Sequence, residues 1–305
     1  MTTILINGDF VDIDQARIGV FDAGFQHGVG LFETMTALVT GGESKVISLD
    51  EHLDRIILSA KELGLASELS KSALEEAVVA TVERAGDARQ RVRLTLTGGD
   101  MNLTSRDTPA RAHEPTVVVA AQPMTPYPDE MYRNGVMVVA ADMRINPLDE
   151  SQGHKTLNYW MRLRELQKAA AKRAGEALVF TITNHLAGGC VSNVILVKGG
   201  QIITPIARGE EIASASFGKG PVLRSPVLPG ITRATVLSWT KENSREVVKR
   251  MVTLDDVFQA DEVFLTNSIF GALPVVAFEK QTIGAGTVGA FTAEIIARWK
   301  TTTTV

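Results

Sequence analysis

Several features are scarce in this sequence, and each scarcity removes a class of protein. Cys190 is the one cysteine among 305 residues, so no internal disulfide can form, which suits a reducing compartment such as the cytoplasm. No apolar run approaches the roughly 18 residues that a membrane helix needs, and the first ten residues do not resemble a signal peptide. Lys and Arg (31) do not outnumber Asp and Glu (35), and no basic stripe marks a nucleic-acid surface. We therefore expect a soluble, cytoplasmic protein that binds neither membranes nor nucleic acid.

Three common site motifs are missing as well. The five histidines stand at no metal-ligand spacing with one another or with Cys190, so we expect no metal site. Gly28 and Gly30 are followed by Leu31, Phe32 and Glu33 rather than by the third glycine of a dinucleotide fingerprint. The segment from Gly24 to Gly28 holds no serine, which excludes a nucleophile elbow there.

The hydrophobic patterning predicts two α+β domains. Asn7 and Gly8 indicate a hairpin turn, and a capping box from Ser48 to Glu51 is expected to open a helix that ends at Gly64. Three prolines within residues 122–130 mark an interdomain linker, which separates an N-terminal α/β domain (1–121) from a C-terminal domain (131–305). Further elements are expected as helices at about 70–85, 157–174, 232–242 and 285–300, and as strands at 91–97, 115–121, 135–142, 177–183, 193–197, 201–204 and 262–267.

Four short segments could carry chemistry. Lys155 stands at the mouth of an apolar helix, where desolvation would lower its pKa and allow a Schiff base, although a lone lysine is more often solvated. Residues 228–233 (LPGITR) form a glycine turn before a helix, which is either an anion seat or simply a helix cap. Residues 264–268 (FLTNS) end a strand on hydroxyl and amide groups, as phosphate ligands or the start of a loop. Arg55 is either a phosphate clamp or a side chain reaching solvent.

Taken in order, these segments resemble a known family. The succession HLDR (52–55), KTLNY (155–159), SN before an apolar strand (192–193), LPGITR (228–233) and ADEVFLTNS (260–268) is similar to the class IV aminotransferases, the fold-type IV pyridoxal phosphate enzymes. That family includes branched-chain and D-amino acid aminotransferases and 4-amino-4-deoxychorismate lyase. The resemblance runs from Asn7 to Val276. It implies a homodimer of mixed α/β chains, with a smaller N-terminal domain and a larger C-terminal domain that has a β-barrel-like core.

The resemblance also implies site residues. Lys155 matches the lysine that forms a Schiff base with pyridoxal 5′-phosphate and moves the substrate proton. Arg93 and His27 match substrate-binding positions, Arg93 by lining up with an arginine for the substrate carboxylate. The other implied cofactor ligands are Arg55 on the phosphate, Tyr159 near the phenolic oxygen, Gly230, Ile231 and Thr232 at the phosphate turn, and Asn267 and Ser268 beyond it.

Two departures from the family pattern affect these expectations. Gly188 stands where the family places a glutamate that binds the pyridine nitrogen, and losing a charge-assisted hydrogen bond of roughly 2–3 kcal/mol would slow turnover about 100-fold. Segment 27–30 (HGVG) replaces the usual aromatic and acidic residues near the substrate. Cys190, beside Gly188, is interpreted as a small buried filler or a thiol close to the ligand.

The expected function is transfer of an amino group between a small amino acid and a 2-oxo acid through Lys155. A lyase of the aminodeoxychorismate type is the alternative, because residues 31–35 (LFETM) and 264–268 look closer to that branch. A third reading is a pyridoxal phosphate-binding protein with little turnover, as Gly188 would allow.

Overall fold

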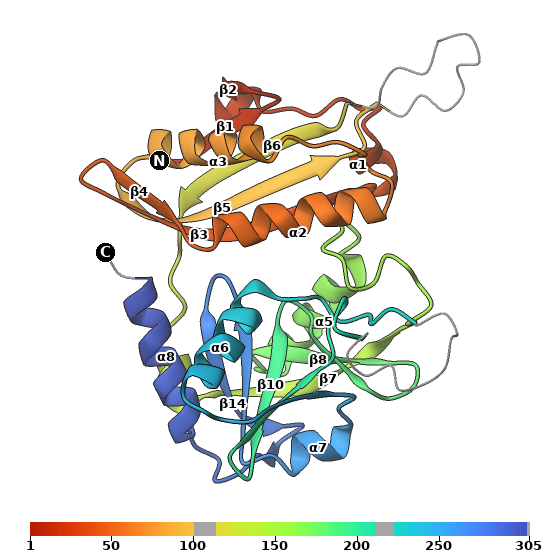
Figure 1. The fold of residues 1–305 in the computed structure, drawn as a ribbon, viewed down its shortest axis with the longest axis vertical. Coiled ribbons are helices and arrows are strands. Elements are labelled where there is room, and N and C mark those ends of the chain that lie inside the picture. The colour runs from red at the N-terminus through yellow and green to blue at the C-terminus, as the bar shows by residue number, and fades with distance from the viewer. Residues whose placement is uncertain (101–113, 212–222, 304–305) are drawn as a thin grey trace. The chain divides into compact units, whose positions relative to one another are not determined.

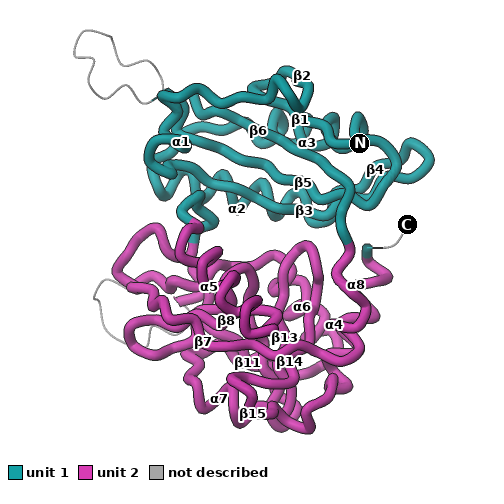
Figure 2. Tube along the Cα trace, turned by 180° about the vertical axis from the view of Figure 1, so that it is seen from behind, with its two compact units in different colours: residues 1–125, 154–158, 303–305 teal, residues 126–153, 159–302 magenta. Residues whose placement is uncertain are grey.

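Two β-sheets organise the chain, one in each of two units. The computed structural model describes residues 1–100, 114–211 and 223–303. Unit 1 comprises Met1–Thr125, His154–Asn158 and Thr303–Val305, and unit 2 comprises Pro126–Gly153 and Tyr159–Thr302 (Figure 2). Within the proline-rich segment, the chain passes from unit 1 to unit 2 between Thr125 and Pro126.

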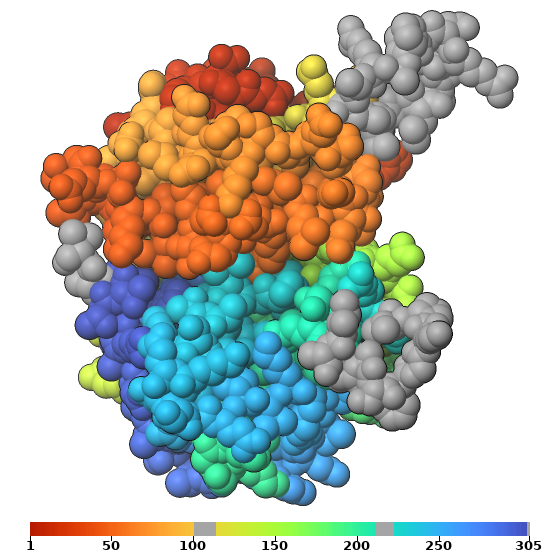
Figure 3. Space-filling view, in the orientation of Figure 1, coloured from red at the N-terminus to blue at the C-terminus, as the bar shows by residue number. Residues whose placement is uncertain are grey.

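Unit 1 is an antiparallel sheet with helices on one face. The strand order is β2-β1-β6-β5-β3-β4, and every neighbouring pair is antiparallel. The strands are β1 (Thr3–Ile6), β2 (Asp9–Val11), β3 (Gly30–Thr40), β4 (Glu43–Val46), β5 (Ala88–Thr97) and β6 (Thr116–Pro123). Helices α2 (Leu49–Glu62) and α3 (Lys71–Ala85) cover one face (Figures 1 and 2), and their side chains form the orange surface of Figure 3. The short η1 (Ile13–Gln15) and α1 (Ala23–His27) lie between β2 and β3.

Alternation of apolar and polar residues explains this sheet. In β5, Val92, Leu94 and Leu96 are fully buried, whereas Arg93 and Thr95 between them are half-buried. The buried set packs with residues of α2 and α3 in one apolar cluster. The opposite face of β5 is therefore the place where polar side chains such as Arg93 collect.

The predicted capping box at Ser48 is wrong. Ser48 adopts a left-handed conformation with φ of 54°, and its side chain caps no N–H among the described residues. The N–H of Ile47 donates to the Thr36 carbonyl of β3, so the chain is still on the sheet ladder one residue earlier and turns sharply at Ser48. Helix α3 begins with a genuine cap, because the Ser70 hydroxyl accepts the Ala73 N–H at 3.2 Å.

Unit 2 is a larger mixed sheet that curls. The strand order is β12-β11-β10-β13-β14-β7-β8-β9, with β15 pairing with β14, and the pairs β14/β7, β7/β8 and β11/β12 are parallel. Strand β9 also lies close to β10 and β11, so the end of the sheet returns toward its other half. The strands are β7 (Val136–Ile145), β8 (Glu176–Thr181), β9 (Leu186–Gly189), β10 (Asn193–Lys198), β11 (Gln201–Pro205), β12 (Val247–Arg250), β13 (Glu262–Asn267), β14 (Gly271–Phe278) and β15 (Gln281–Thr282).

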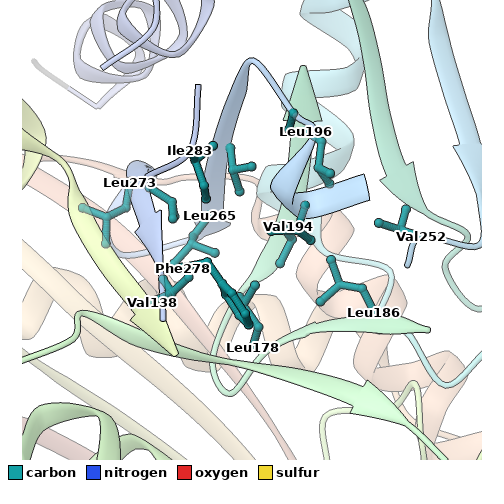
Figure 4. Close-up of a cluster of buried hydrophobic side chains, with 14 of the residues drawn as sticks. Val138, Leu178, Leu186, Val194, Leu196, Val252, Leu265, Leu273, Phe278 and Ile283 are labelled. Atoms are coloured by element: carbon teal, nitrogen blue, oxygen red, sulfur yellow. The ribbon is translucent and has the colours of Figure 1, made fainter. Parts of the chain in front are cut away.

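Apolar side chains from these strands fill the curled sheet. Val138, Leu178, Val194, Leu265 and Leu273, drawn in Figure 4, come from five different strands and are almost entirely buried. The helices of the unit are α4 (Asp129–Asn134), α5 (Trp160–Ala171), α6 (Ile231–Glu242), α7 (Leu254–Phe258) and α8 (Ala290–Thr302). The mixed α/β architecture and the barrel-like second sheet are as the sequence predicted.

Candidate functional site

Lys155, the candidate cofactor lysine, lies in an extended segment of unit 1, residues 154–158, beside β3. Its backbone carbonyl accepts the Phe32 N–H at 2.9 Å, and the Leu157 N–H donates to the Gly30 carbonyl at 2.9 Å. A β-carbon at residue 30 would lie 2.6 Å from a Leu157 methyl carbon and 2.6 Å from the Leu96 carbonyl oxygen. Only glycine at residue 30 permits this close approach, which fixes Lys155 against the sheet.

The helix expected to begin near residue 157 begins later. Helix α5 starts at Trp160, so Lys155 precedes it by five residues rather than standing at its mouth. The backbone bonds to β3 give the reason, because they keep residues 155–157 extended and outside any helical turn.

The ring of Phe32 lies close to two candidate cations. Lys155 Nζ is 4.3 Å from the ring centroid, and Arg93 Cζ is 3.8 Å from it. Cations within about 6 Å of an aromatic centroid are attracted by its quadrupole. Unit 1 thus brings the candidate cofactor lysine and the candidate carboxylate anchor to one aromatic side chain. The sequence pattern does not distinguish Phe32 from other apolar strand residues, so the residue was not predicted.

Arg55, the candidate phosphate clamp, belongs to a buried cluster with Glu33 and His52. Glu33 on β3 accepts hydrogen bonds from Arg55 Nε at 2.7 Å and Arg55 Nη2 at 2.6 Å, and its second oxygen also lies 2.7 Å from His52 Nδ1. Glu33 and His52 are 1% exposed, whereas the Arg55 side chain retains 10%. One edge of the guanidinium is therefore held by both oxygens of one carboxylate, and this carboxylate was not predicted from the sequence.

Within this cluster, Glu33 and Arg55 are charged and His52 is neutral. Burial alone would raise the pKa of Glu33, but the Arg55 guanidinium and the His52 ring outweigh it and lower the pKa to about 2. Burial lowers the pKa of His52 despite the attraction of Glu33, and the positive charges of Arg55 and Lys155 lower it further. Neutral His52 therefore donates its Nδ1–H to ionised Glu33, and Arg55 remains the cation of the cluster.

In unit 2, the segment from Gly188 to Ser192 wraps a buried carboxylate. The two oxygens of Glu176 accept N–H groups from Cys190 at 3.2 Å and Val191 at 3.3 Å, and the Ser192 hydroxyl at 3.1 Å. The Ala177 N–H donates to the same side chain at 3.0 Å. Burial raises the pKa of Glu176, and these donors oppose the shift. Burial likewise raises the pKa of Cys190 to about 12, so its thiol stays protonated at neutral pH.

The backbone at Gly188 requires glycine. Its φ is +139°, a region that side-chain-bearing residues rarely adopt, and an added β-carbon would lie 2.8 Å from the Ser192 carbonyl oxygen. The side chain facing the next residues of this segment is Arg162 on α5. Its Nη1 donates to the carbonyls of Gly189 at 3.2 Å and Cys190 at 3.3 Å.

The LPGITR turn forms the N-terminus of α6. Gly230 is the N-cap residue, and a β-carbon there would overlap the Asn193 side chain, which itself donates to the Leu228 carbonyl at 2.9 Å. The Thr232 hydroxyl is buried and has no hydrogen-bond partner among the described residues, and the same holds for Thr266 on β13. The first N–H groups of a helix also lack intrahelical partners. This end of α6 therefore presents several unsatisfied donors, including Ile231 and Thr232.

The remaining predicted residues are distributed as follows. Tyr159 is the N-cap residue of α5, and the guanidinium carbon of Arg162 lies 5.8 Å from its ring centroid. Asn267 accepts the N–H groups of Ile269 and Phe270 at 2.9 Å each, so it holds the turn between β13 and β14 in which half-buried Ser268 stands. His27 ends α1 in unit 1, and its side chain is exposed.

A metal-binding cluster and a membrane-spanning helix are both absent from the described residues. No group of three or more His, Cys, Asp or Glu side chains is arranged there to hold a metal ion. Nor does any helix in that part of the chain have the length and apolar character needed to cross a membrane.

Comparison with known proteins shows which family the chain is similar to. The family model described as amino-transferase class IV matches residues 30–278. A protein of Methanocaldococcus jannaschii, provisionally assigned as a branched-chain-amino-acid aminotransferase, is 32% identical over 97% of this chain and 95% of its own length. A D-alanine aminotransferase of Bacillus licheniformis is 29% identical over 96% of this chain and 94% of the enzyme.

Solved structures are similar across the whole chain. A branched-chain amino acid aminotransferase of T.th., crystallised with pyridoxamine 5′-phosphate, superposes with a TM-score of 0.84 at 26% identity, covering 99% of this chain and 94% of that one. An aminodeoxychorismate lyase of Bacillus subtilis is also similar in sequence, at 24% identity over 92% of this chain and 88% of the lyase.

Proposed function

The chain belongs to the class IV aminotransferases, and we propose that it transfers an amino group from a small amino acid to a 2-oxo acid, with pyridoxal 5′-phosphate as cofactor. With the cofactor bound, the amino group would pass from an amino acid, which would depart as a 2-oxo acid, to a second 2-oxo acid, which would depart as an amino acid. The observation that carries the proposal is Lys155, fixed against β3 beside Phe32 and Arg93.

The phosphate of the cofactor fits the N-terminus of α6. A buried hydroxyl without a partner is costly unless a ligand supplies one, and Thr232 provides such a hydroxyl beside the free amides of a twelve-residue helix. Helix N-termini favour anions because of their dipole and unsatisfied N–H groups. We infer that Gly230, Ile231, Thr232 and Ser268 of unit 2 bind the phosphate, and that Asn267 shapes the adjoining turn. The family resemblance alone implies Arg55 as a further phosphate ligand.

The chain's own groups then perform separate tasks. Pyridoxal phosphate, when bound, serves as an electron sink for the bond that breaks at the substrate Cα. Lys155 holds the cofactor covalently and afterwards moves the proton at its Nζ. Arg93 binds the substrate carboxylate, and the Phe32 ring keeps both cations oriented while excluding water. His27 binds the substrate side chain, and Tyr159 binds the phenolic oxygen of the cofactor.

The test is a visible absorption spectrum of the purified protein, titrated with L- and D-amino acids. We expect a cofactor band that one class of amino donor bleaches, with stoichiometric release of the matching 2-oxo acid. Lys155→Ala should abolish both the covalent band and turnover, whereas Lys172→Ala, an exposed lysine of unit 2, should change neither. Amino transfer at the wild-type rate by Lys155→Ala would contradict the mechanism.

A lyase is the second candidate, favoured by the similarity to aminodeoxychorismate lyase. Release of pyruvate from aminodeoxychorismate without any amino acceptor would decide for it. A bound cofactor that no donor and no aminodeoxychorismate converts would instead indicate a binding protein with little turnover.

We also propose a cytoplasmic homodimer. Unit 1 exposes three neighbouring apolar side chains, Val20 (63%), Phe21 (68%) and Phe25 (73%), close in sequence to His27. Exposed apolar side chains this close in sequence support a protein contact surface in this segment. Sedimentation should give twice the mass of one chain, and Phe21→Glu with Phe25→Glu should shift it to the monomer. The matched double change Leu58→Glu with Ile13→Glu, at exposed apolar residues elsewhere in unit 1, should not.

We propose that residues 1–121 and 131–305 are separate domains joined by the linker 122–130. Limited proteolysis that cuts within 122–130 before any other described segment would support it, and first cuts inside β5 or β7 would contradict it.

A further inference from the structure

The segment Gly188–Ser192 of unit 2 lies between two side chains of opposite charge. Glu176 binds the N–H groups of the segment, and Arg162 binds its carbonyls. Gly188 stands where family members carry the glutamate that binds the pyridine nitrogen of the cofactor. On the proposed function, on which this inference rests, a different group of this chain must bind the pyridine nitrogen.

Glu176 cannot take over the role of the missing glutamate. Its two carboxylate oxygens already accept three backbone N–H groups and the Ser192 hydroxyl, at 3.0 to 3.3 Å. The residue is 1% exposed. Turning it toward a ligand would leave four donors, two of them fully buried, without this partner, which is unfavourable. Glu176 therefore stabilises the segment.

Gly188 cannot be replaced by a carboxylate on this backbone either. Its φ of +139° and the 2.8 Å approach of the Ser192 oxygen to a β-carbon both select glycine. The backbone of this segment therefore requires a residue without a side chain at position 188. It is not the family's loop with only the glutamate removed.

Arg162 is a charged side chain beside this segment that still has N–H groups to donate to a ligand. Its Nη1 holds the carbonyls of Gly189 and Cys190, while its Nε and Nη2 donate to no described residue. The side chain is half-buried, and its guanidinium carbon lies 5.8 Å from the ring centroid of Tyr159, the residue proposed to bind the phenolic oxygen of the cofactor. A guanidinium has five N–H donors and no acceptor, so it hydrogen-bonds an unprotonated ring nitrogen and repels a protonated one.

We propose that Arg162 binds the pyridine nitrogen of the cofactor in place of the family glutamate and keeps that nitrogen unprotonated. An unprotonated ring withdraws electrons less strongly. Breaking the bond at the substrate Cα therefore depends more on Lys155, whose Nζ moves the proton. The enzyme then transfers amino groups more slowly than relatives that carry the glutamate, and it suppresses side reactions that need a longer-lived carbanion.

The test uses holoenzyme loaded with pyridoxal phosphate that carries ¹⁵N in the ring, observed by NMR. We expect the wild-type nitrogen to show the chemical shift of a neutral pyridine from pH 6 to pH 9. Arg162→Glu should move it to the shift of a pyridinium, and Arg162→Gln should give an intermediate value that titrates. Arg164→Gln, an exposed arginine of the same helix, should leave the wild-type shift unchanged.

A second measurement does not depend on NMR or on turnover. N-methyl pyridoxal phosphate carries a permanent positive charge at the ring nitrogen, and its affinity is read from absorbance. We expect wild-type protein to bind it at least tenfold more weakly than pyridoxal phosphate, and Arg162→Glu to reduce or reverse that ratio. Each affinity is measured alongside the circular dichroism melting curve, which shows whether a variant is folded.

The outcomes separate the two levels of inference. A wild-type pyridinium shift, or equal affinities of wild-type protein for the two cofactors, overturns the role of Arg162 and leaves the aminotransferase assignment standing. Failure of the wild-type protein to bind pyridoxal phosphate at all overturns the proposed function itself. If Arg162→Glu does not fold, the wild-type shift and Arg162→Gln still decide the question.

Discussion

Two buried glutamates show how their neighbours determine the charge of a carboxyl group. Glu33 and Glu176 are each 1% exposed, yet the pKa of Glu33 falls to about 2 and that of Glu176 rises. Glu33 faces two guanidinium nitrogens of Arg55 and one ring nitrogen of His52, whereas Glu176 faces backbone N–H groups and a hydroxyl. Neutral donors only partly offset the cost of burying charge, while a guanidinium exceeds it. The first residue orients Arg55, and the second orders a loop.

Removing the Glu33 charge should be costly. Breaking a buried ion pair from one side costs about 3–5 kcal/mol, so Glu33→Gln should lower the free energy of unfolding by about 3 kcal/mol. It should also weaken binding of pyridoxal phosphate more than binding of pyridoxal, because Arg55 loses the carboxylate that orients it. Urea unfolding and cofactor titration measure the two effects. Glu43→Gln, on the exposed edge strand β4, is the control, and an equal effect of both variants would contradict the argument.

Gly188 offers a second test at the residue scale. Gly188→Ala combines a strained φ of +139° with a clash against a backbone oxygen, and should lower the free energy of unfolding by about 3 kcal/mol. Gly200 has φ of +82° and open space around its β-carbon, so Gly200→Ala should cost only about 1 kcal/mol. Urea unfolding distinguishes them. Equal costs would mean that the Ser192 oxygen gives way and that the loop tolerates a side chain at residue 188.

Among the elements, amphipathic helices, alternating strands and buried strands such as β8 and β10 were predictable, whereas β14 was not. The pattern of Val92, Leu94 and Leu96 predicted β5 because its polar residues face away from the core. Strand β14 is buried almost throughout and carries Pro274, so neither alternation nor composition indicated a strand there. Its two neighbours supply the pairing that stabilises it: β13 precedes it by a short turn, whereas β7 is remote in sequence.

Ser48 and Ser70 each precede a helix, but only Ser70 caps one. Ser70 caps α3, so Ser70→Ala should lower the free energy of unfolding by about 1 kcal/mol. Ser48 instead adopts a left-handed conformation that is unfavourable for a residue with a side chain, so Ser48→Gly should raise it by up to about 1 kcal/mol. Chemical unfolding of both variants measures the signs. A loss of stability in Ser48→Gly would restore the capping role that the sequence suggested.

At the scale of the whole molecule, position along the chain is a poor guide to which unit holds a site residue. Lys155 and Tyr159 are four residues apart, yet Lys155 lies in the short return of the chain to unit 1 and Tyr159 opens α5 of unit 2. The motifs predicted the residue types that the chemistry needs. They could not predict this return, because its cause is the pairing of residues 155–157 with β3, more than a hundred residues earlier.

Both units should also lose stability in acid, each through one carboxylate of its own. Glu210 of unit 2 has a pKa of about 2, because Arg233 and Lys249 outweigh its burial, and Glu33 has a similar value in unit 1. Both pKa values lie below the ordinary 4.5. As the pH falls, the carboxylate in each unit is therefore protonated at a higher pH in the unfolded chain than in the folded one. Stability from these groups is complete above pH 4.5 and is lost as the pH falls toward 2. Glu176, whose pKa is raised, acts oppositely and loses its contribution as the pH rises through its folded value.

The fluorophores of the chain allow this response to be assigned to one unit. All three tryptophans, Trp160, Trp239 and Trp299, lie in unit 2, so their fluorescence follows that unit while far-ultraviolet circular dichroism follows both. We expect Glu210→Gln to flatten the fall in stability between pH 4.5 and 3 when it is measured by tryptophan fluorescence. Glu33→Gln should flatten it by circular dichroism and leave the fluorescence transition unchanged. Identical curves by both probes in every variant would mean that the units unfold as one, because a carboxylate in either unit then sets the acid stability of the entire chain.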